Sequence, residues 1–217
     1  RYFVFSGLIG VMIILILKLG LYYLAPLVST WVMILDDIEM EWLGSIAKLM
    51  TYLGGLWVLF TLYKYLVLIF TAPLMSMLSE EVENDLSGHP SRQVGFSSMI
   101  KEIIRGASIA GRNLLIELGL TLVIFVIGAV LGMAPLAAIV VLLIQAYYAG
   151  FGNLDFWAER HLNHTETIRF MRDHRGMCIA NGGVFLLLLS IPIVGAFLAS
   201  PFATIAGTIH AHRYQRP

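Results

Sequence analysis

The chain of 217 residues is 59% hydrophobic and only 13% charged, against about 45–50% and about 25% in a soluble domain. These proportions exclude an ordinary soluble protein and indicate a membrane protein. Its 14 basic and 14 acidic residues cancel, so overall charge gives no reason to expect a nucleic acid as partner. The single cysteine, Cys178, excludes an intrachain disulfide and indicates no zinc site.

The first apolar tract runs from Tyr2 to Leu35 and is interrupted only by Lys18. It is longer than the core of a signal peptide, about 7–15 residues, and has no small-residue cleavage signature. We therefore expect residues 1–35 to form a retained membrane helix, longer than a hydrocarbon core of about 30 Å requires. Because the sequence opens at Arg1 and not at a methionine, we also expect that some native residues precede it.

The second tract, Trp42 to Leu78, has the same excess length and predicts a second long transmembrane helix over residues 42–78. Pro26 in the first tract and Pro73 in the second are expected either to kink these helices or to end them. For the lysines inside the two tracts we expect either snorkelling to the membrane interface or packing between helices. These lysines are Lys18, Lys48 and Lys64.

Residues 79–113 are more polar and predict cytoplasmic and amphipathic helices. Ser79 precedes several acids, which predicts the N-cap of a helix, and Gly88 followed by Pro90 predicts the end of that helix. From Phe96 onward, apolar residues recur at three- and four-residue steps, so we expect an amphipathic helix that lies on the membrane or on the bundle. Its polar face carries Glu102, Arg105 and Arg112.

This charged stripe has two interpretations. Glu102 and Arg105 are three residues apart and can pair, and Arg112 lies two turns further along the same stripe. Arginines on an interfacial helix commonly meet lipid headgroups. The sharper interpretation is an anion port, in which guanidinium groups donate to an oxyanion and the glutamate holds one arginine in place. The spacing leaves both interpretations open.

The third and fourth tracts, 118–154 and 176–212, contain no Asp, Glu, Lys or Arg, and each has a proline near its middle, Pro135 or Pro192. Each proline divides its tract into two arms. As helices, these arms would be about 24–30 Å long, which is marginal for a full crossing of the membrane. Re-entrant hairpins and ordinary helical hairpins with tight outer turns both fit. We assign the first hairpin, the cytoplasmic link and the second hairpin to residues 114–157, 158–175 and 176–212.

The helices that begin after these two prolines would have their N-termini inside the membrane. Unpaired amides and the helix dipole attract anions at such ends, and transporters use broken helices in this way. Tight proline turns that pack against each other or against a neighbouring subunit explain the same pattern. The two explanations again stay open.

The distribution of basic residues predicts the orientation of the chain. Residues 36–41 contain acids and no base, whereas residues 79–113, residues 158–175 and both termini carry arginines. The positive-inside rule then puts both termini and both long links in the cytoplasm, and only the acidic link outside.

Patterns of soluble catalysis are absent from the sequence, which has no Gly-rich phosphate loop, no H-E-x-x-H and no G-x-S-x-G. We therefore predict neither an enzyme nor a cofactor. The six histidines fall in polar links or near the C-terminal end, where solvated side chains are expected and not a metal site. Glu117, at the mouth of the third tract, is a candidate partner for a neighbouring base.

A series of short motifs extends along the chain from the second tract. In order, they are Ala72-Pro73-Leu74, Leu78-Ser79-Glu80, Val82-Glu83, Leu86-Ser87-Gly88, Lys101-Glu102, Arg105, Asp155-Phe156, His161, Arg169 and Arg175. This order resembles the CysZ sulfate permeases of the EI24-like superfamily, and the likeness covers essentially the whole chain.

The resemblance implies a bacterial inner-membrane protein that admits sulfate for cysteine synthesis. It implies an all-α fold with two long transmembrane helices and two hemi-penetrating, re-entrant hairpins, and a homo-oligomer. In this family an arginine just before the first helix is associated with sulfate binding, which points to Arg1. A Glu/Arg network before the first hairpin is associated with the conduction path, which points to Glu102 and Arg105.

We therefore predict a sulfate permease in the lipid bilayer, with Arg1, Glu102, Arg105 and Arg112 as anion-binding or pore residues. No closed polar lumen is obvious in a lone protomer, which favours a pore between subunits. The alternative is a structural or adaptor membrane protein whose amphipathic segment and hairpins shape the bilayer or hold partners. Transport by the Arg105→Ala and Glu102→Ala variants separates these hypotheses.

Overall fold

The computed structural model describes the chain except for residues 37–40, 89–95, 192 and 216–217. Some side chains inside helices, including those of residues 41–51 and 96–103, also lie outside this description. The described residues form seven helices, which confirms the all-α prediction: α1 (Tyr2–Asp36), α2 (Glu41–Ser87), α3 (Phe96–Val130), α4 (Ala134–His161), α5 (His164–Asp173), α6 (Arg175–Leu189) and α7 (Val194–Gln215).

Five stretches of these helices are long and apolar enough to cross a membrane: Tyr2–Tyr23, Gly54–Ser87, Ile104–Gly128, Pro135–His161 and Val194–Tyr214. Many large apolar side chains on them are exposed, as expected of surfaces that face lipid. The protein is therefore a multi-pass membrane protein.

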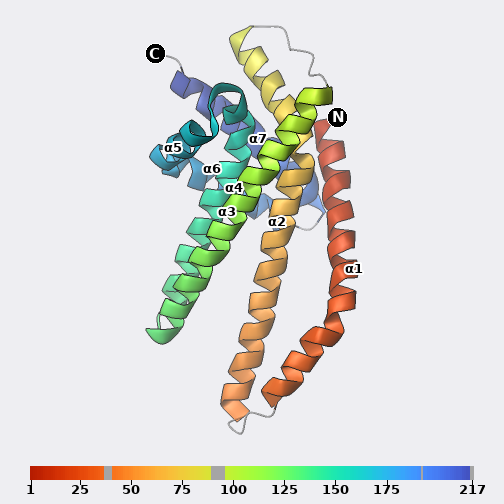
Figure 1. Ribbon diagram of the computed structural model, residues 1–217, viewed down its shortest axis with the longest axis vertical. Coiled ribbons are helices and arrows are strands. Elements are labelled where there is room, and N and C mark those ends of the chain that lie inside the picture. Colours follow the sequence, from red (N-terminus) through yellow and green to blue (C-terminus); the bar gives the residue numbers. More distant parts are fainter. Residues whose placement is uncertain (37–40, 89–95, 192, 216–217) are drawn as a thin grey trace.

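The helices α1 and α2 are the longest elements and lie side by side along the long axis (Figure 1). Pro26 lies inside α1 and Pro73 inside α2, so neither proline ends its helix. The second half of α1 bends toward α2 (Figure 1), as expected where a proline lacks the N–H for the hydrogen bond to the preceding turn. At 47 residues, α2 is about 70 Å long and extends beyond a hydrocarbon core of about 30 Å.

The predicted N-cap at Ser79 is wrong, because α2 continues through this residue to Ser87. Pro73 precedes Ser79 but does not break α2, and the Ser79 hydroxyl is paired with Thr208 of α7 instead of a backbone amide. The predicted end of this helix is confirmed. Gly88 follows with a positive φ of 70°, and its N–H donates to the carbonyl of Asn84 at 2.8 Å, an arrangement that glycine adopts without steric cost.

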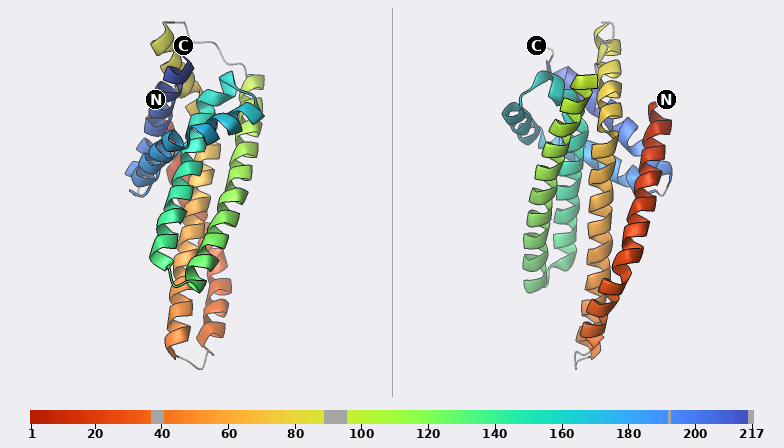
Figure 2. Two further views of the ribbon diagram at one scale, coloured as in Figure 1. Left: turned by 90° about the vertical axis from the view of Figure 1, so that its left-hand side faces the viewer. Right: turned by 45° about the vertical axis from the view of Figure 1, so that its right-hand side comes forward.

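The amphipathic segment starts at Phe96, as predicted, but it is continuous with the first arm of the first hairpin in the single helix α3. The chain turns at residues 131–133, where Gly132 has a φ of 67°, and α4 begins with Pro135 in its first turn. The helices α3 and α4 therefore form a helical hairpin. Its turn lies short of the far end of α1 and α2 in all three views (Figures 1 and 2).

The second hairpin consists of α6 and α7, and its helices lie toward the end of the molecule that holds both termini (Figures 1 and 2). Pro192 in its turn lies outside the described residues. The two hairpins pack closely, because α4 and α6 meet at glycines. A Cβ atom on Gly182 would lie 1.8 Å from the carbonyl oxygen of Ala146, and one on Gly150 would lie 1.9 Å from that of Cys178. This contact fixes the position of α4, which carries Asp155, Glu159, Arg160 and His161 of the polar clusters described next.

Candidate functional site

Arg105 links three helices near the end of the bundle where the termini lie. From α3, its Nη2 donates to Asp155 Oδ1 of α4 and to Thr167 Oγ1 of α5, each at 3.3 Å. Its Nη1 lies 3.6 Å from Glu159 Oε2 and, although the atom is buried, makes no hydrogen bond to any of the described residues. The guanidinium group therefore has an unused donor, while a quarter of the side chain, 24%, stays accessible.

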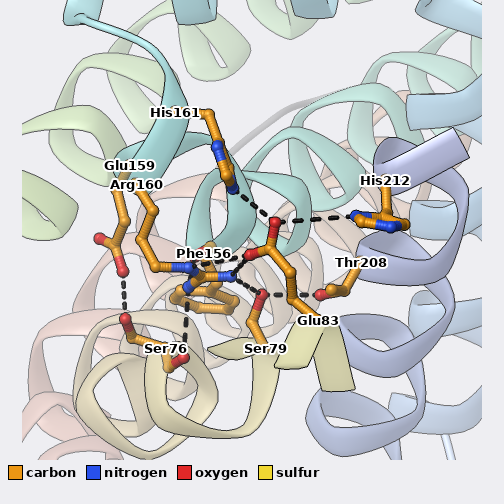
Figure 3. Close-up of polar contacts among 9 residues, drawn as sticks. All are labelled: Ser76, Ser79, Glu83, Phe156, Glu159, Arg160, His161, Thr208 and His212. Carbon is orange, nitrogen blue, oxygen red and sulfur yellow. Dashed lines mark hydrogen bonds and ion pairs between the residues drawn. The ribbon is translucent and has the colours of Figure 1, made fainter. Parts of the chain in front are cut away.

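Glu83 forms the centre of a second polar cluster, drawn in Figure 3. Its Oε2 accepts from Arg160 Nη2 at 3.1 Å and from Arg160 Nε at 3.3 Å. Its Oε1 lies 2.7 Å from His161 Nε2 and 3.8 Å from His212 Nδ1. One carboxylate of α2 thus faces basic groups of α4 and α7.

Arg160 uses all three of its guanidinium nitrogens in this cluster (Figure 3). Besides Glu83, its Nη2 donates to Ser79 Oγ at 2.8 Å, and its Nη1 donates to the carbonyls of Phe156 at 2.6 Å and Ser76 at 3.3 Å. Ser79 also pairs with Thr208 of α7 at 2.7 Å. The cluster therefore fastens α2, α4 and α7 together.

Glu159 connects the two clusters. Its carboxylate accepts a hydrogen bond from the Ser76 hydroxyl of α2 (Figure 3) and lies beside Arg105 of α3. Asp155 and Glu159 are one helical turn apart on α4 and share one face of that helix, and Arg160 follows Glu159 directly. Within the described part of the chain, no three His, Cys, Asp or Glu side chains are placed to hold a metal ion.

A third polar contact lies deep in the membrane-spanning region. Lys64 Nζ of α2 donates to both carboxylate oxygens of Glu117 of α3, at 2.7 and 2.6 Å. The hydroxyl of Tyr65 donates to the same carboxylate at 2.8 Å. Both charged side chains are completely buried. The predicted pairing of Glu117 with a base is confirmed, and Lys64 packs between helices and does not snorkel.

The other lysines differ from Lys64. Lys18 is exposed on α1, where its long side chain is free to extend along the helix toward the membrane interface. The side chain of Lys48 lies outside the described residues.

The four predicted anion-binding residues do not share one set of partners. Arg1 is exposed and contacts the hydroxyl of Tyr2 at 3.0 Å and Glu81 of α2 at 3.6 Å. Arg112 donates to its neighbour Asn113 at 3.1 Å. The side chain of Glu102 lies outside the described residues, so its predicted pairing with Arg105 is not described. Of the three whose side chains are described, Arg105 has the most extensive polar surroundings.

Sequence reasoning did not assign Glu83, Asp155, Glu159 or Arg160 to the site. A signal was available, because Asp155, Glu159 and Arg160 are charged residues that directly follow a long apolar tract. Their partners on α2 and α3 are 50 to 84 residues away in the sequence, which no local spacing reveals.

Comparison with known proteins agrees with the motif pattern. The family model described as "Sulfate transporter CysZ/Etoposide-induced protein 2.4", EI24, matches residues 1–200. The chain belongs to the EI24 family. The resemblance predicted from the motifs is thereby confirmed.

Several curated relatives of this EI24 protein are named "Sulfate transporter CysZ". The one from Pseudomonas fluorescens is 28% identical over 202 residues, which cover 90% of this chain and 80% of the relative. The one from Pseudomonas paraeruginosa is 27% identical over 190 residues, or 82% and 74% of the two chains. The one from Vibrio cholerae is 24% identical over 201 residues, or 87% and 77%.

Proposed function

We propose that this EI24 protein is a sulfate permease that admits sulfate to the cytoplasm across a bacterial inner membrane, in support of cysteine synthesis. The names of its relatives support sulfate as the substrate. The observation in the structure that carries the proposal is Arg105. It is a partly accessible guanidinium group in a polar cluster between three helices, and one buried nitrogen of it has no hydrogen-bond acceptor.

Sulfate is a doubly charged oxyanion, and its removal from water is costly unless protein donors replace the lost hydrogen bonds. The planar guanidinium group of Arg105 is suited to two oxygens of such an anion. Asp155 and Glu159 hold the group in place and also compete with sulfate for its donors. This competition keeps binding weak enough for release, which conduction requires.

The other predicted residues extend this path. Arg1, at the end of the long axis where both termini lie (Figure 1), adds positive charge that attracts anions. Glu102 and Arg112 lie on α3 with Arg105, one turn before it and two turns after it. We propose that flux follows a sulfate gradient or is coupled to another ion, since these 217 residues carry no nucleotide-binding motif.

We also propose the topology of two long transmembrane helices and two re-entrant hairpins, with both termini in the cytoplasm. The turn of the first hairpin, short of the far end of α1 and α2, supports this arrangement (Figure 2). At 15 residues, α6 is about 22 Å long and too short for a core of about 30 Å. The family resemblance supports a homo-oligomer.

Growth of a bacterium tests this function. A strain without its own sulfate uptake, with sulfate as the sulfur source, is expected to grow when it expresses this chain and to fail with an empty vector. Both strains are expected to grow on cysteine, which serves as the control. If the chain reaches the membrane and sulfate still does not support growth, the adaptor hypothesis replaces the permease.

A further inference from the structure

A small cavity of about 20 Å³ lies between α2, α3 and α4. This volume holds about one water molecule. Most of its wall is apolar or consists of glycine and alanine, and its polar residues are Tyr65, Asn113 and Asp155.

The cavity connects the two charged contacts that involve α3. At one side, Asp155 bonds to Arg105. At the other side, the Tyr65 hydroxyl bonds to Glu117, and Asn113 precedes Glu117 by one turn of α3. A path through the cavity from Arg105 therefore leads to the buried pair of Lys64 and Glu117.

Asn113 has an unused donor at this cavity. The side chain is 1% exposed, and its Oδ1 accepts from Arg112 Nη1 at 3.1 Å. Its Nδ2 has no acceptor among the described residues. Burial of an N–H group without an acceptor costs about 1–3 kcal/mol, so an amide at a cavity wall is well placed to bind a water molecule or an oxyanion.

The pair of Lys64 and Glu117 is poorly explained as a helix fastener alone. Both charges are removed from water, which costs free energy. For this reason, well-packed apolar residues of similar size commonly stabilise a helix contact as well as a buried ion pair does, or better. Ionisable residues inside a membrane protein mark substrate paths more often than they stabilise the fold. The geometry also suits an oxyanion, because Lys64 and Tyr65 already donate together to the oxygens of one carboxylate.

We propose that Lys64, Tyr65 and Asn113 form an inner anion station, the next binding point for sulfate after Arg105. In the empty protein, the carboxylate of Glu117 occupies the donors that sulfate oxygens would take. The inference rests on the proposed sulfate permeation. Because the cavity is too small for sulfate, the structure describes a closed form, and passage requires α2 to separate from α3 and α4 at this level.

Neutral substitutions in the pair distinguish a station from a fastener. In liposomes that contain the purified protein, Glu117→Gln leaves Lys64 without its counter-charge. The sulfate concentration at half-maximal uptake is expected to fall at least about tenfold, with a lower maximal rate. Lys64→Gln leaves a carboxylate that repels sulfate, so uptake is expected to fall below about one tenth of the unaltered protein. The double variant is expected to transport slowly without tighter binding.

A fastener gives a different result. Each single variant would then lose stability and uptake to a similar extent, and the double variant would recover both. That symmetrical outcome overturns the inference. If the unaltered protein takes up no sulfate, the proposed function itself fails, and the station fails with it; normal uptake with symmetrical variants overturns the station alone.

Asn113→Asp provides a second test if the Glu117 variant does not fold. It keeps the size of the side chain and the oxygen that faces Arg112 but replaces the unused donor by a charged acceptor at the cavity. Uptake is expected to fall at least about tenfold, while the protein elutes as a single species in detergent. Unchanged uptake overturns the inference.

Discussion

Arg105 and Arg160 both lie in polar clusters at the same end of the bundle, but their surroundings differ. Arg160 donates from all three nitrogens, to Glu83, Ser79 and two backbone carbonyls. Arg105 bonds through Nη2, and its Nη1 has no hydrogen-bond acceptor. A fully bonded arginine fastens helices, whereas one with a spare donor is able to take a ligand. This difference is the reason for proposing that Arg160 serves assembly and that Arg105 binds the anion.

The largest expected effect is on transport by Arg105→Ala. Because this change removes the donors proposed to receive sulfate, uptake is expected to fall at least about tenfold, or about 1.4 kcal/mol. The melting temperature in detergent is also expected to fall, because the change takes the guanidinium group away from the buried carboxylates of Asp155 and Glu159. Uptake is therefore compared at a temperature at which the variant and the unaltered protein remain folded. Arg172→Ala is the matched control: Arg172 is 60% exposed on α5 and lies 3.9 Å from Asp173, so normal uptake is expected. Equal losses in both variants would remove the special role of Arg105.

Arg160→Ala is expected to act on stability first. It leaves Glu83 without its main partner and removes the hydrogen bonds to Ser79 and to the carbonyls of Ser76 and Phe156, at a cost of about 2 kcal/mol or more. Thermal unfolding followed by the loss of monodisperse protein in detergent measures this effect. Arg160→Lys keeps the charge but not the forked geometry, so an intermediate stability is expected. A fully stable Arg160→Ala variant would contradict the fastening role.

Gly182→Ala tests the close packing of α6 against α4, the helix that carries Arg160 and the acidic partners of Arg105. The added methyl group would lie 1.8 Å from the carbonyl oxygen of Ala146, so α4 and α6 must separate, at a cost of about 1–3 kcal/mol. The neighbouring Gly183 has open space around it, and Gly183→Ala is expected to be neutral or slightly stabilising. Similar melting temperatures for the two variants would show that the close contact is unimportant.

The smallest expected effects concern the two histidines of the Glu83 cluster. His161 Nε2 lies within hydrogen-bond distance of Glu83, at 2.7 Å, whereas His212 Nδ1 lies at 3.8 Å. The loss of stability is therefore expected to be about 1 kcal/mol for His161→Ala and smaller for His212→Ala. The same thermal assay measures both variants, and a larger effect at His212 would reverse the assigned order.

Local signals in the sequence predicted much of the fold. The glycine after Ser87, the proline in the first turn of α4 and the apolar period from Phe96 correctly located an end and two starts of helices. The N-cap at Ser79 was wrong, because a capping residue inside an unbroken helical stretch gives the same local pattern.

The candidate site was less predictable. Arg105 was selected from its helix face and from the family motifs, but its partners Asp155 and Thr167 come from α4 and α5. Lys64 and Glu117 are 53 residues apart, and the sequence indicated only snorkelling or helix packing for Lys64 and an unidentified basic partner for Glu117. Periodicity defines the face of one helix, whereas the pairing of faces depends on packing, such as the glycine contact between α4 and α6.

Uptake of radiolabelled sulfate into liposomes that contain the purified protein is the most direct test of the account. Chloride and phosphate serve as competitors, and empty liposomes serve as the control. We expect saturable sulfate uptake above the empty liposomes, with most of it lost in an Arg105→Ala variant that remains folded at the temperature of the assay. No uptake by correctly folded and inserted protein, or full uptake by Arg105→Ala, would contradict the account.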